Sequence, residues 1–294
     1  MARTKAAAII VSVLLSGCSM QQQLVRTGAI PEKVLDGFRF TEGVCTDGKG
    51  NIYFTDLQQD RIYQWTSDGR LLIFKDQAHK ANGLAVDASG RLVACQSAPR
   101  GMLVAYEPNG SEVVLAQTYE GKRFNSVNDL WIDRKGGIYF TDPRYGSRAQ
   151  MEQDGEHVYY LTPDRKKVIR VINDMVGPNG LTGSRDGKRL YVADHKAGKT
   201  YVYDVRPDGT LANKRLFADT GSDGMTLDRH GNVYLTTRSS VWICGPKGRK
   251  LAAIEVPQTP SNVCFGGPDG RTLYITAGTG LYAIRMEVRG VWSN

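Results

Sequence analysis

Six side chains that carry an oxygen atom recur along the chain, each eight residues before a glycine of a repeated turn. They are Glu42, Asn82, Asn128, Asn179, Asp223 and Asn262. Two carboxylates and four amides gathered at one point would bind a hard cation such as Ca²⁺ or Mg²⁺, which prefers oxygen ligands. Asn-Gly and Asp-Gly are also common turn dipeptides. The constant spacing of eight residues to the glycine favours a metal site, and so does the Glu42-Gly43 pair, which is a poor turn former.

The glycines that set this phase belong to an internal repeat. Gly50, Gly90, Gly136, Gly187, Gly231 and Gly270 are 40, 46, 51, 44 and 39 residues apart. Each is followed by an apolar strand and then a second strand of alternating character, and in five copies by another turn and strand. Four short strands in such a period are typical of a β-propeller blade. The sequence therefore predicts an all-β, six-bladed propeller, with the oxygen-bearing positions converging on its axis.

The sixth copy lacks an outer strand after residues 280–284. Residues 33–36 align with the outer strands of the other copies, so we expect this N-terminal strand to complete the last blade. The propeller domain would then span residues 31–294.

Loops after the second strands should return to the mouth where the six oxygen-bearing residues lie, because the first two strands of a blade are antiparallel. These loops are 56–58, 96–100, 142–145, 194–196 and the one at Arg238. Arg144, Tyr145 and His195 are therefore candidate contacts for a small polar substrate. For His195 and Arg238, simple solvation at the surface explains the sequence equally well.

The first seventeen residues have the layout of a secretory signal, with Arg3 and Lys5 before an apolar run of ten. The following Leu15-Ser16-Gly17-Cys18 resembles the bacterial lipobox, so Cys18 is a candidate lipidation site and residues 18–30 a tether. Ser19 after this cysteine is typical of lipoproteins on the periplasmic side of the outer membrane. An ordinary signal peptide with a chance cysteine is the alternative.

The net charge of +8 does not come from a basic tail, since no run of Lys and Arg exceeds three residues. We therefore expect a mildly basic solvated surface, and no nucleic-acid partner. The other cysteines, each alone in an apolar run, are expected to be buried thiols, although an oxidising compartment would permit disulfides. They are Cys45, Cys95, Cys244 and Cys264.

The sequence resembles the gluconolactonase and senescence marker protein (regucalcin) family, and more distantly diisopropylfluorophosphatase. The resemblance extends from about Glu32 to Met286 and is most specific in residues 40–43, 121–133, 137–146, 176–181 and 222–228. It implies a six-bladed propeller with one catalytic divalent metal on the axis. Ca²⁺ is the expected metal, with Mg²⁺, Mn²⁺ or Zn²⁺ as alternatives.

The resemblance also implies roles for individual residues. Glu42, Asn179 and Asp223 would be metal ligands, Asn128 a fourth ligand or a substrate contact, and Asp223 also the general base. Asn82 and Asn262 match no consistent family ligand and would be channel wall. Ser126 stands where regucalcin-like members have a substrate-binding Arg. Arg123 is the nearby candidate to replace that Arg.

The expected function is opening of a sugar (aldono) lactone, such as gluconolactone, by metal-activated water. Hydrolysis of a phosphotriester or another ester at the same metal is an alternative, since an open hard-metal site also polarises P=O. A surface-anchored binding propeller without turnover is a third hypothesis. A nucleophilic serine hydrolase is disfavoured, because the chain has no Gly-x-Ser-x-Gly motif. The expected partners are the lactone and, through Cys18, a membrane; no obligate protein partner is evident.

Overall fold

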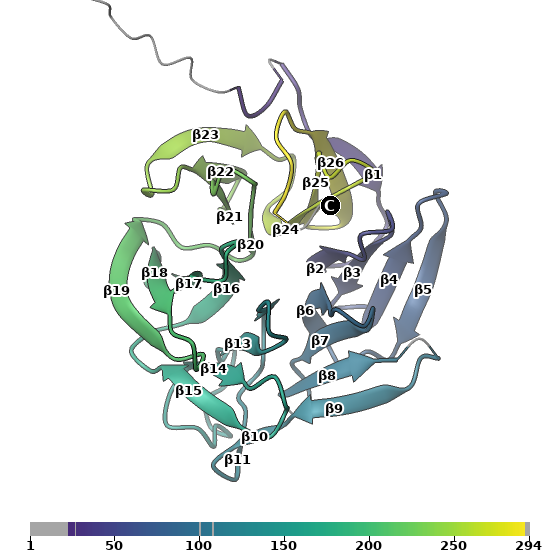
Figure 1. Ribbon diagram of the computed structural model, residues 1–294. Helices are drawn as coiled ribbons and strands as arrows, with labels where there is room; N and C mark the ends of the chain where they lie inside the picture. The colour runs from purple at the N-terminus through teal and green to yellow at the C-terminus, as the bar shows by residue number, and fades with distance from the viewer. Residues whose placement is uncertain (1–22, 27, 100, 108, 292–294) are drawn as a thin grey trace, which may run out of the picture.

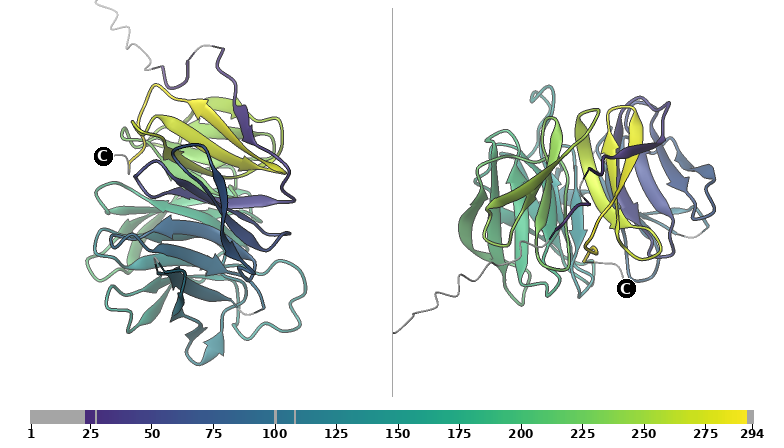
Figure 2. Two further views of the ribbon diagram at one scale, coloured as in Figure 1. Left: turned by 90° about the vertical axis from the view of Figure 1, so that its right-hand side faces the viewer. Right: turned by 90° about the horizontal axis from the view of Figure 1, so that it is seen from above.

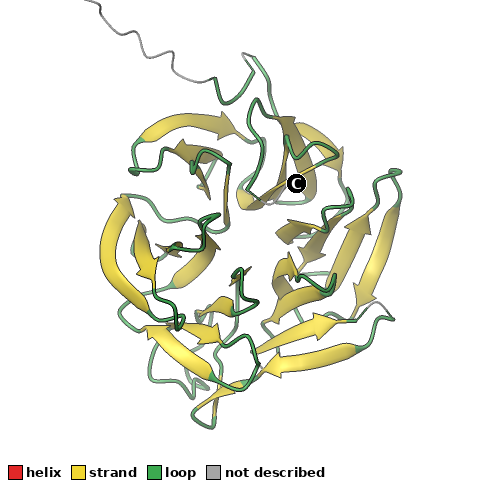
Figure 3. Cartoon of the chain, viewed as in Figure 1, coloured by secondary structure: helices red, strands yellow, loops and turns green. Residues whose placement is uncertain are grey.

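The computed structural model describes residues 23–26, 28–99, 101–107 and 109–291, and these contain strands and loops but no helix (Figure 3). Six four-stranded antiparallel sheets surround a central axis (Figure 1), and the ring is seen edge-on in Figure 2. The prediction of an all-β, six-bladed propeller is confirmed. No helix in this described part is long and apolar enough to cross a membrane.

The strands follow one another from the axis outwards in each blade. Blade 1 contains β2 (Thr41–Thr46), β3 (Ile52–Asp56), β4 (Arg61–Trp65) and β5 (Leu71–Asp76); blade 2 contains β6 (Ala81–Val86), β7 (Leu92–Gln96), β8 (Met102–Tyr106) and β9 (Glu112–Ala116). The hairpin of β10 (Thr118–Tyr119) and β11 (Lys122–Arg123) precedes blade 3, which contains β12 (Leu130–Ile132), β13 (Ile138–Asp142), β14 (His157–Leu161) and β15 (Val168–Ile172). Blade 4 contains β16 (Pro178–Gly183), β17 (Arg189–Asp194), β18 (Lys199–Val205) and β19 (Leu211–Ala218). Blade 5 contains β20 (Met225–Leu227), β21 (Val233–Thr236), β22 (Ser240–Cys244) and β23 (Lys250–Glu255).

Blade 6 closes the ring with strands from both ends of the chain. Its order is β24 (Pro260–Gly266), β25 (Thr272–Ala277), β26 (Gly280–Arg285) and β1 (Glu32–Leu35), and β1 pairs antiparallel with β26. The expected N-terminal closing strand is therefore present.

The segment before β1, which we expected to be a tether, also packs on the ring. Leu24 is buried among the apolar side chains between blades 5 and 6, and its carbonyl accepts a hydrogen bond from the Glu287 amide at 3.0 Å. Cys18 and the signal segment lie outside the described residues.

The hydrophobic cores lie between neighbouring blades rather than within one blade. Between blades 2 and 3, for example, Val93 and Leu103 pack in one cluster with Phe140 and Tyr159. A single four-stranded sheet cannot bury both of its faces, so each blade needs two neighbours. The four cysteines of the described part are free thiols, three of them buried and Cys264 partly so, as expected.

Three of the four glycines that follow the oxygen-bearing residues lie within inner strands, so the turn interpretation is wrong for them, whereas Gly224 lies in a bend just before β20. Gly43 lies within β2 and Gly180 within β16, each at a β-bulge in the pairing with the next strand. A Cβ atom on Gly180 would lie 2.1 Å from the carbonyl oxygen of Asp223. Glycine therefore allows the innermost strands of neighbouring blades to approach closely, and this approach brings their axial side chains together.

The substitution Gly180→Ala is expected to lower the free energy of unfolding by about 2–3 kcal/mol, because the backbone of blade 4 or 5 must move. Gly245→Ala is the matched control, since its nearest contact at 3.3 Å is the flexible Leu251 side chain. We expect less than about 1 kcal/mol there. Denaturant unfolding of both variants measures the difference, and equal losses would contradict a role for close strand approach.

Candidate active site

Three carboxylates lie near one another in the central channel, with Glu42 and Asp223 at one mouth and Asp129 beside the cavity that continues towards the other face. Glu42 lies at the start of β2, while Asp129 and Asp223 lie just before β12 and β20. Glu42 and Asp129 are buried, and Asp223 is half-buried. Burial raises the pKa of all three, to about 7 for Asp129 and to about 6 for Asp223. The pKa of Glu42 rises well above its usual range, first through burial and then through repulsion from the other two carboxylates.

Asn179 holds one of these carboxylates in place. Its Nδ2 atom donates hydrogen bonds of 2.7 Å both to Asp223 Oδ1 and to the Tyr145 hydroxyl oxygen. Within the described chain, Asn179 Oδ1 and Asp223 Oδ2 have no hydrogen-bond partner. These two oxygens are therefore available to a ligand.

The residues at this mouth fit a hard cation. No Lys or Arg of the described residues forms an ion pair with Glu42, Asp129 or Asp223, so these carboxylates are not neutralised by a paired Lys or Arg. The described part of the chain contains no group of three His, Cys, Asp or Glu residues arranged to hold a metal by themselves. A cation here would also need amide oxygens, as Asn179 provides, and an all-oxygen set suits Ca²⁺ or Mg²⁺.

The remaining amides of the ring differ in availability. The Asn262 side-chain oxygen accepts a 2.8 Å hydrogen bond from the Val263 amide, and the side chain packs where Gly224 leaves space. This contact agrees with a place in the channel wall. Asn128 and Asn82 are buried, and neither side chain makes a hydrogen bond within the described residues. Asn128 therefore stays a candidate ligand or substrate contact.

Asp129 is a site residue that the sequence reasoning missed. It occupies the position where four other copies have glycine after the axial residue, so the break in that pattern was the available signal. Its carboxylate accepts a hydrogen bond from its neighbour Leu130 at 2.9 Å, and it lies close enough to raise the pKa of Glu42.

The loop between β13 and β14 brings Tyr145 to the mouth. The buried carboxylate of Glu156 forms ion pairs with Arg148 of this loop and, at 2.8 Å, with Lys196 of blade 4. Lys196 Nζ also donates to the Arg144 carbonyl and lies 5.2 Å from the centre of the Tyr145 ring. Blade 3 is thus tied to blade 4 beside Asn179.

A family model also matches this chain. The model described as SMP-30/Gluconolactonase/LRE-like region matches residues 40–279, most of the chain. The chain belongs to this SMP-30/gluconolactonase family. A gluconolactonase of Zymomonas mobilis is 29% identical, and the match covers 88% of this chain and 82% of the relative. A lactonase drp35 of Staphylococcus saprophyticus is 27% identical, covering 74% of this chain and 69% of the relative.

A solved structure also resembles this member of the SMP-30/gluconolactonase family. The gluconolactonase XC5397 of Xanthomonas campestris is 32% identical, with a TM-score of 0.82, and the match covers 88% of this chain and 90% of that chain. The likeness therefore extends over nearly the whole propeller.

Two arginines that we expected to contact substrate are engaged elsewhere in this SMP-30/gluconolactonase family member. Arg123, on β11, forms an ion pair with Glu152. The Arg144 guanidinium donates to the carbonyls of Ser147 at 2.7 Å and Asn125 at 3.0 Å. The structure shows no contact of Arg123 or of the Arg144 guanidinium with the three carboxylates. His195 is exposed, and it lies near enough to Asp223 to oppose the rise of its pKa.

The aspartates that end three of the second strands do not face a substrate. Asp142 accepts hydrogen bonds from the backbone amides of Asn125 and Ser126, at 2.9 and 2.8 Å. Asp56 and Asp194 make the equivalent pairs of bonds in blades 1 and 4. All three are buried, so they hold the segment before each inner strand and have a structural role at the mouth.

Proposed function

We propose that this protein hydrolyses a lactone, with a sugar (aldono) lactone such as gluconolactone as its substrate. The observation that carries the proposal is the mouth itself, where Asn179 joins Asp223 to Tyr145 and Glu42 lies close by. Relatives that match most of this chain are described as a gluconolactonase and as lactonases. A mouth lined by carboxylates, amides and a tyrosine hydroxyl suits a hydroxylated substrate.

We propose that the mouth holds one divalent cation, Ca²⁺ first, with Mg²⁺, Mn²⁺ or Zn²⁺ as alternatives. Glu42, Asn179 and Asp223 would be its ligands, and Asn128 a fourth ligand or a substrate contact. When bound, such a cation polarises a carbonyl oxygen and lowers the pKa of a water molecule.

The residues of the chain would divide the remaining work. Asp223 Oδ2 would accept the proton from the attacking water, since Oδ1 is held by Asn179 at 2.7 Å. The water oxygen adds to the lactone carbonyl carbon, the ring C–O bond breaks, and the ring oxygen takes up a proton to give a hydroxy acid. Tyr145 and His195 would contact substrate hydroxyl groups, and the Glu156–Lys196 ion pair would keep the Tyr145 loop in place.

A substrate panel tests this proposal. With Ca²⁺ present, we expect kcat/KM for an aldonolactone to exceed that for an unsubstituted lactone by about tenfold or more, because a polar pocket penalises a substrate that lacks its hydroxyl groups. An aryl ester and a phosphotriester complete the panel, and proton release measures turnover. Preference for the phosphotriester would support the esterase alternative, and binding of the lactone without turnover would support a binding propeller.

We further propose that the protein is an exported lipoprotein, anchored through Cys18 on the periplasmic side of the outer membrane. The lipobox-like sequence before Cys18 supports this localisation. Labelling with radioactive palmitate, compared between the natural chain and Cys18→Ser, tests it.

A further inference from the structure

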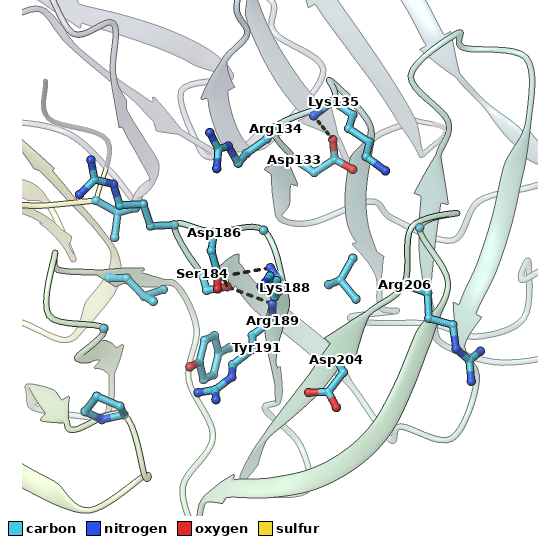
Figure 4. Close-up of a pocket in the computed structure, with 18 of the residues that line it drawn as sticks. Asp133, Arg134, Lys135, Ser184, Asp186, Lys188, Arg189, Tyr191, Asp204 and Arg206 are labelled. Carbon is cyan, nitrogen blue, oxygen red and sulfur yellow. Dashed lines mark hydrogen bonds between the residues drawn. The ribbon is translucent and has the colours of Figure 1, made fainter.

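Basic side chains that are scattered in the sequence gather on the face opposite the active-site mouth. Turns at the far ends of the strands line a groove of about 1000 Å³ between blades 3, 4 and 5 (Figure 4). The inner strand β16 connects the two faces of the ring. Asn179 lies near its end at the mouth, and the turn at 184–189, which lines the groove, follows its other end. The groove and the active site are therefore on opposite faces of the ring.

The groove carries an excess of positive charge. Five exposed cationic residues that line it form no ion pair within the described chain: Arg134, Arg185, Lys188, Arg189 and Arg206. The lining holds seven Lys and Arg side chains against four Asp, and each Asp already has hydrogen-bond or ion-pair partners in the chain. Asp133, for example, accepts from the Tyr160 hydroxyl and two backbone amides, and Asp204 forms an ion pair with Arg215. The expectation of a mildly basic solvated surface therefore does not describe this face, which is strongly basic.

The N-terminal segment enters the fold beside this groove. Gln23, Leu24 and Val25 line a second hollow together with His230 and Pro246, and these last two residues also line the basic groove. Cys18 precedes Gln23 by five residues. A chain spans at most about 3.6 Å per residue, so a lipid on Cys18 would lie within about 18 Å of this face.

We propose that the basic groove docks on an anionic phospholipid surface. A Lys or Arg near such a surface contributes about 1 kcal/mol, and the attraction falls off within about 10 Å at ordinary salt. A lipid on Cys18 would hold the end of the chain at the membrane, and a basic groove beside it would add affinity and orient the ring. The mouth with Asp223 and Glu42 would then face away from the membrane, open to soluble substrate. The attraction of the groove itself does not depend on the lipid at Cys18.

Vesicle co-sedimentation of an unlipidated protein tests the groove separately from the anchor. Residues 18–294 carrying Cys18→Ser are suitable, because all six blades and their cores are formed by residues from Leu24 onwards. We expect this protein to bind vesicles that contain phosphatidylglycerol, to ignore pure phosphatidylcholine vesicles, and to dissociate at high salt. The double variant Arg185→Glu/Arg206→Glu is expected to bind the anionic vesicles at least about tenfold more weakly.

The control variant Arg39→Glu/Lys122→Glu makes the same change in net charge at exposed positions outside the groove. It should keep vesicle binding, the groove variant should keep lactone hydrolysis in solution, and both variants should keep an unchanged melting temperature. Lys188→Glu replaces the groove variant if that variant is unstable. Equal losses in the two double variants, or no preference for anionic vesicles, would overturn the proposal. Displacement from the vesicles by millimolar glycerol phosphate at constant ionic strength would also overturn it, because the groove would then be a site for small phosphates.

Discussion

Replacing Asp223 by alanine is expected to lower kcat/KM for lactone hydrolysis by about 10²- to 10⁴-fold while the ring stays folded. Asp223 combines two tasks in the proposed mechanism, since it would bind the cation and take the proton from water. Its Oδ1 atom is held by Asn179, and the half-buried Asp223 lies in a bend just before β20, outside the strand pairing, so the substitution breaks no ladder hydrogen bond of the blade. Initial rates with a saturating divalent cation measure the effect.

Two further variants separate the tasks of Asp223. Asp223→Asn keeps the size of the side chain and one oxygen, so it should bind the cation more weakly and still lose most of the rate. Asn82→Ala is the matched control, since Asn82 is a buried axial residue without a proposed ligand role. A rate loss in Asn82→Ala as large as in Asp223→Ala would contradict the assignment, as would full activity in Asp223→Ala.

The fold could be predicted from the sequence because each copy repeats a local requirement. All six repeat glycines have positive φ, for example 96° at Gly50 and 86° at Gly136, so the turn that sets the phase needs glycine in every blade. The same phase located Glu42, Asn179 and Asp223 at one mouth. The spacing between the turn glycine and the axial residue depends only on neighbouring residues, so it can be read directly from the sequence.

The rest of the site depends on contacts between distant segments. Arg123 and Arg144 carry a suitable charge and are close in sequence to residues of the mouth. In the structure, however, Arg123 pairs with Glu152, and the Arg144 guanidinium donates to two loop carbonyls. Asp56, Asp142 and Asp194 occupy rim positions, and their carboxylates turn inwards to backbone amides. Neither outcome follows from residue type or spacing, because each is decided by which unpaired donor or acceptor lies within reach.

Removing the proposed cation with a chelator is expected to abolish hydrolysis and to make the stability of the protein fall as the pH rises from about 4 to about 7. Without a cation, the pKa values of Asp129 and Asp223 are about 7 and about 6 in the folded state, against 3.8 for an ordinary aspartate. Between these values the folded state holds protons that the unfolded state has released. The contribution of these two carboxylates to the free energy of unfolding is therefore fully present at low pH, and it is lost as the pH rises through their folded-state pKa values.

A bound cation should reverse the effect of pH at this site. It favours the ionised carboxylates, and protons compete with it for the same oxygens, so its stabilising effect grows with pH. The test compares the melting temperature of the cation-loaded and chelated protein at about pH 5 and about pH 8. We expect a difference of several degrees at the higher pH and a smaller one at the lower pH.

The comparison between the two forms isolates the mouth from the other titrating groups. Asp142, with a pKa raised to about 7 by burial, and Asp204, with a pKa lowered to about 2 by Arg215, titrate in both forms and cancel in the difference. Asp223→Asn should reduce the pH dependence of the difference, since it removes one of the facing carboxylates. A difference that is the same at both pH values would mean that the cation does not bind between Glu42 and Asp223, because only ionised carboxylates link its binding to pH.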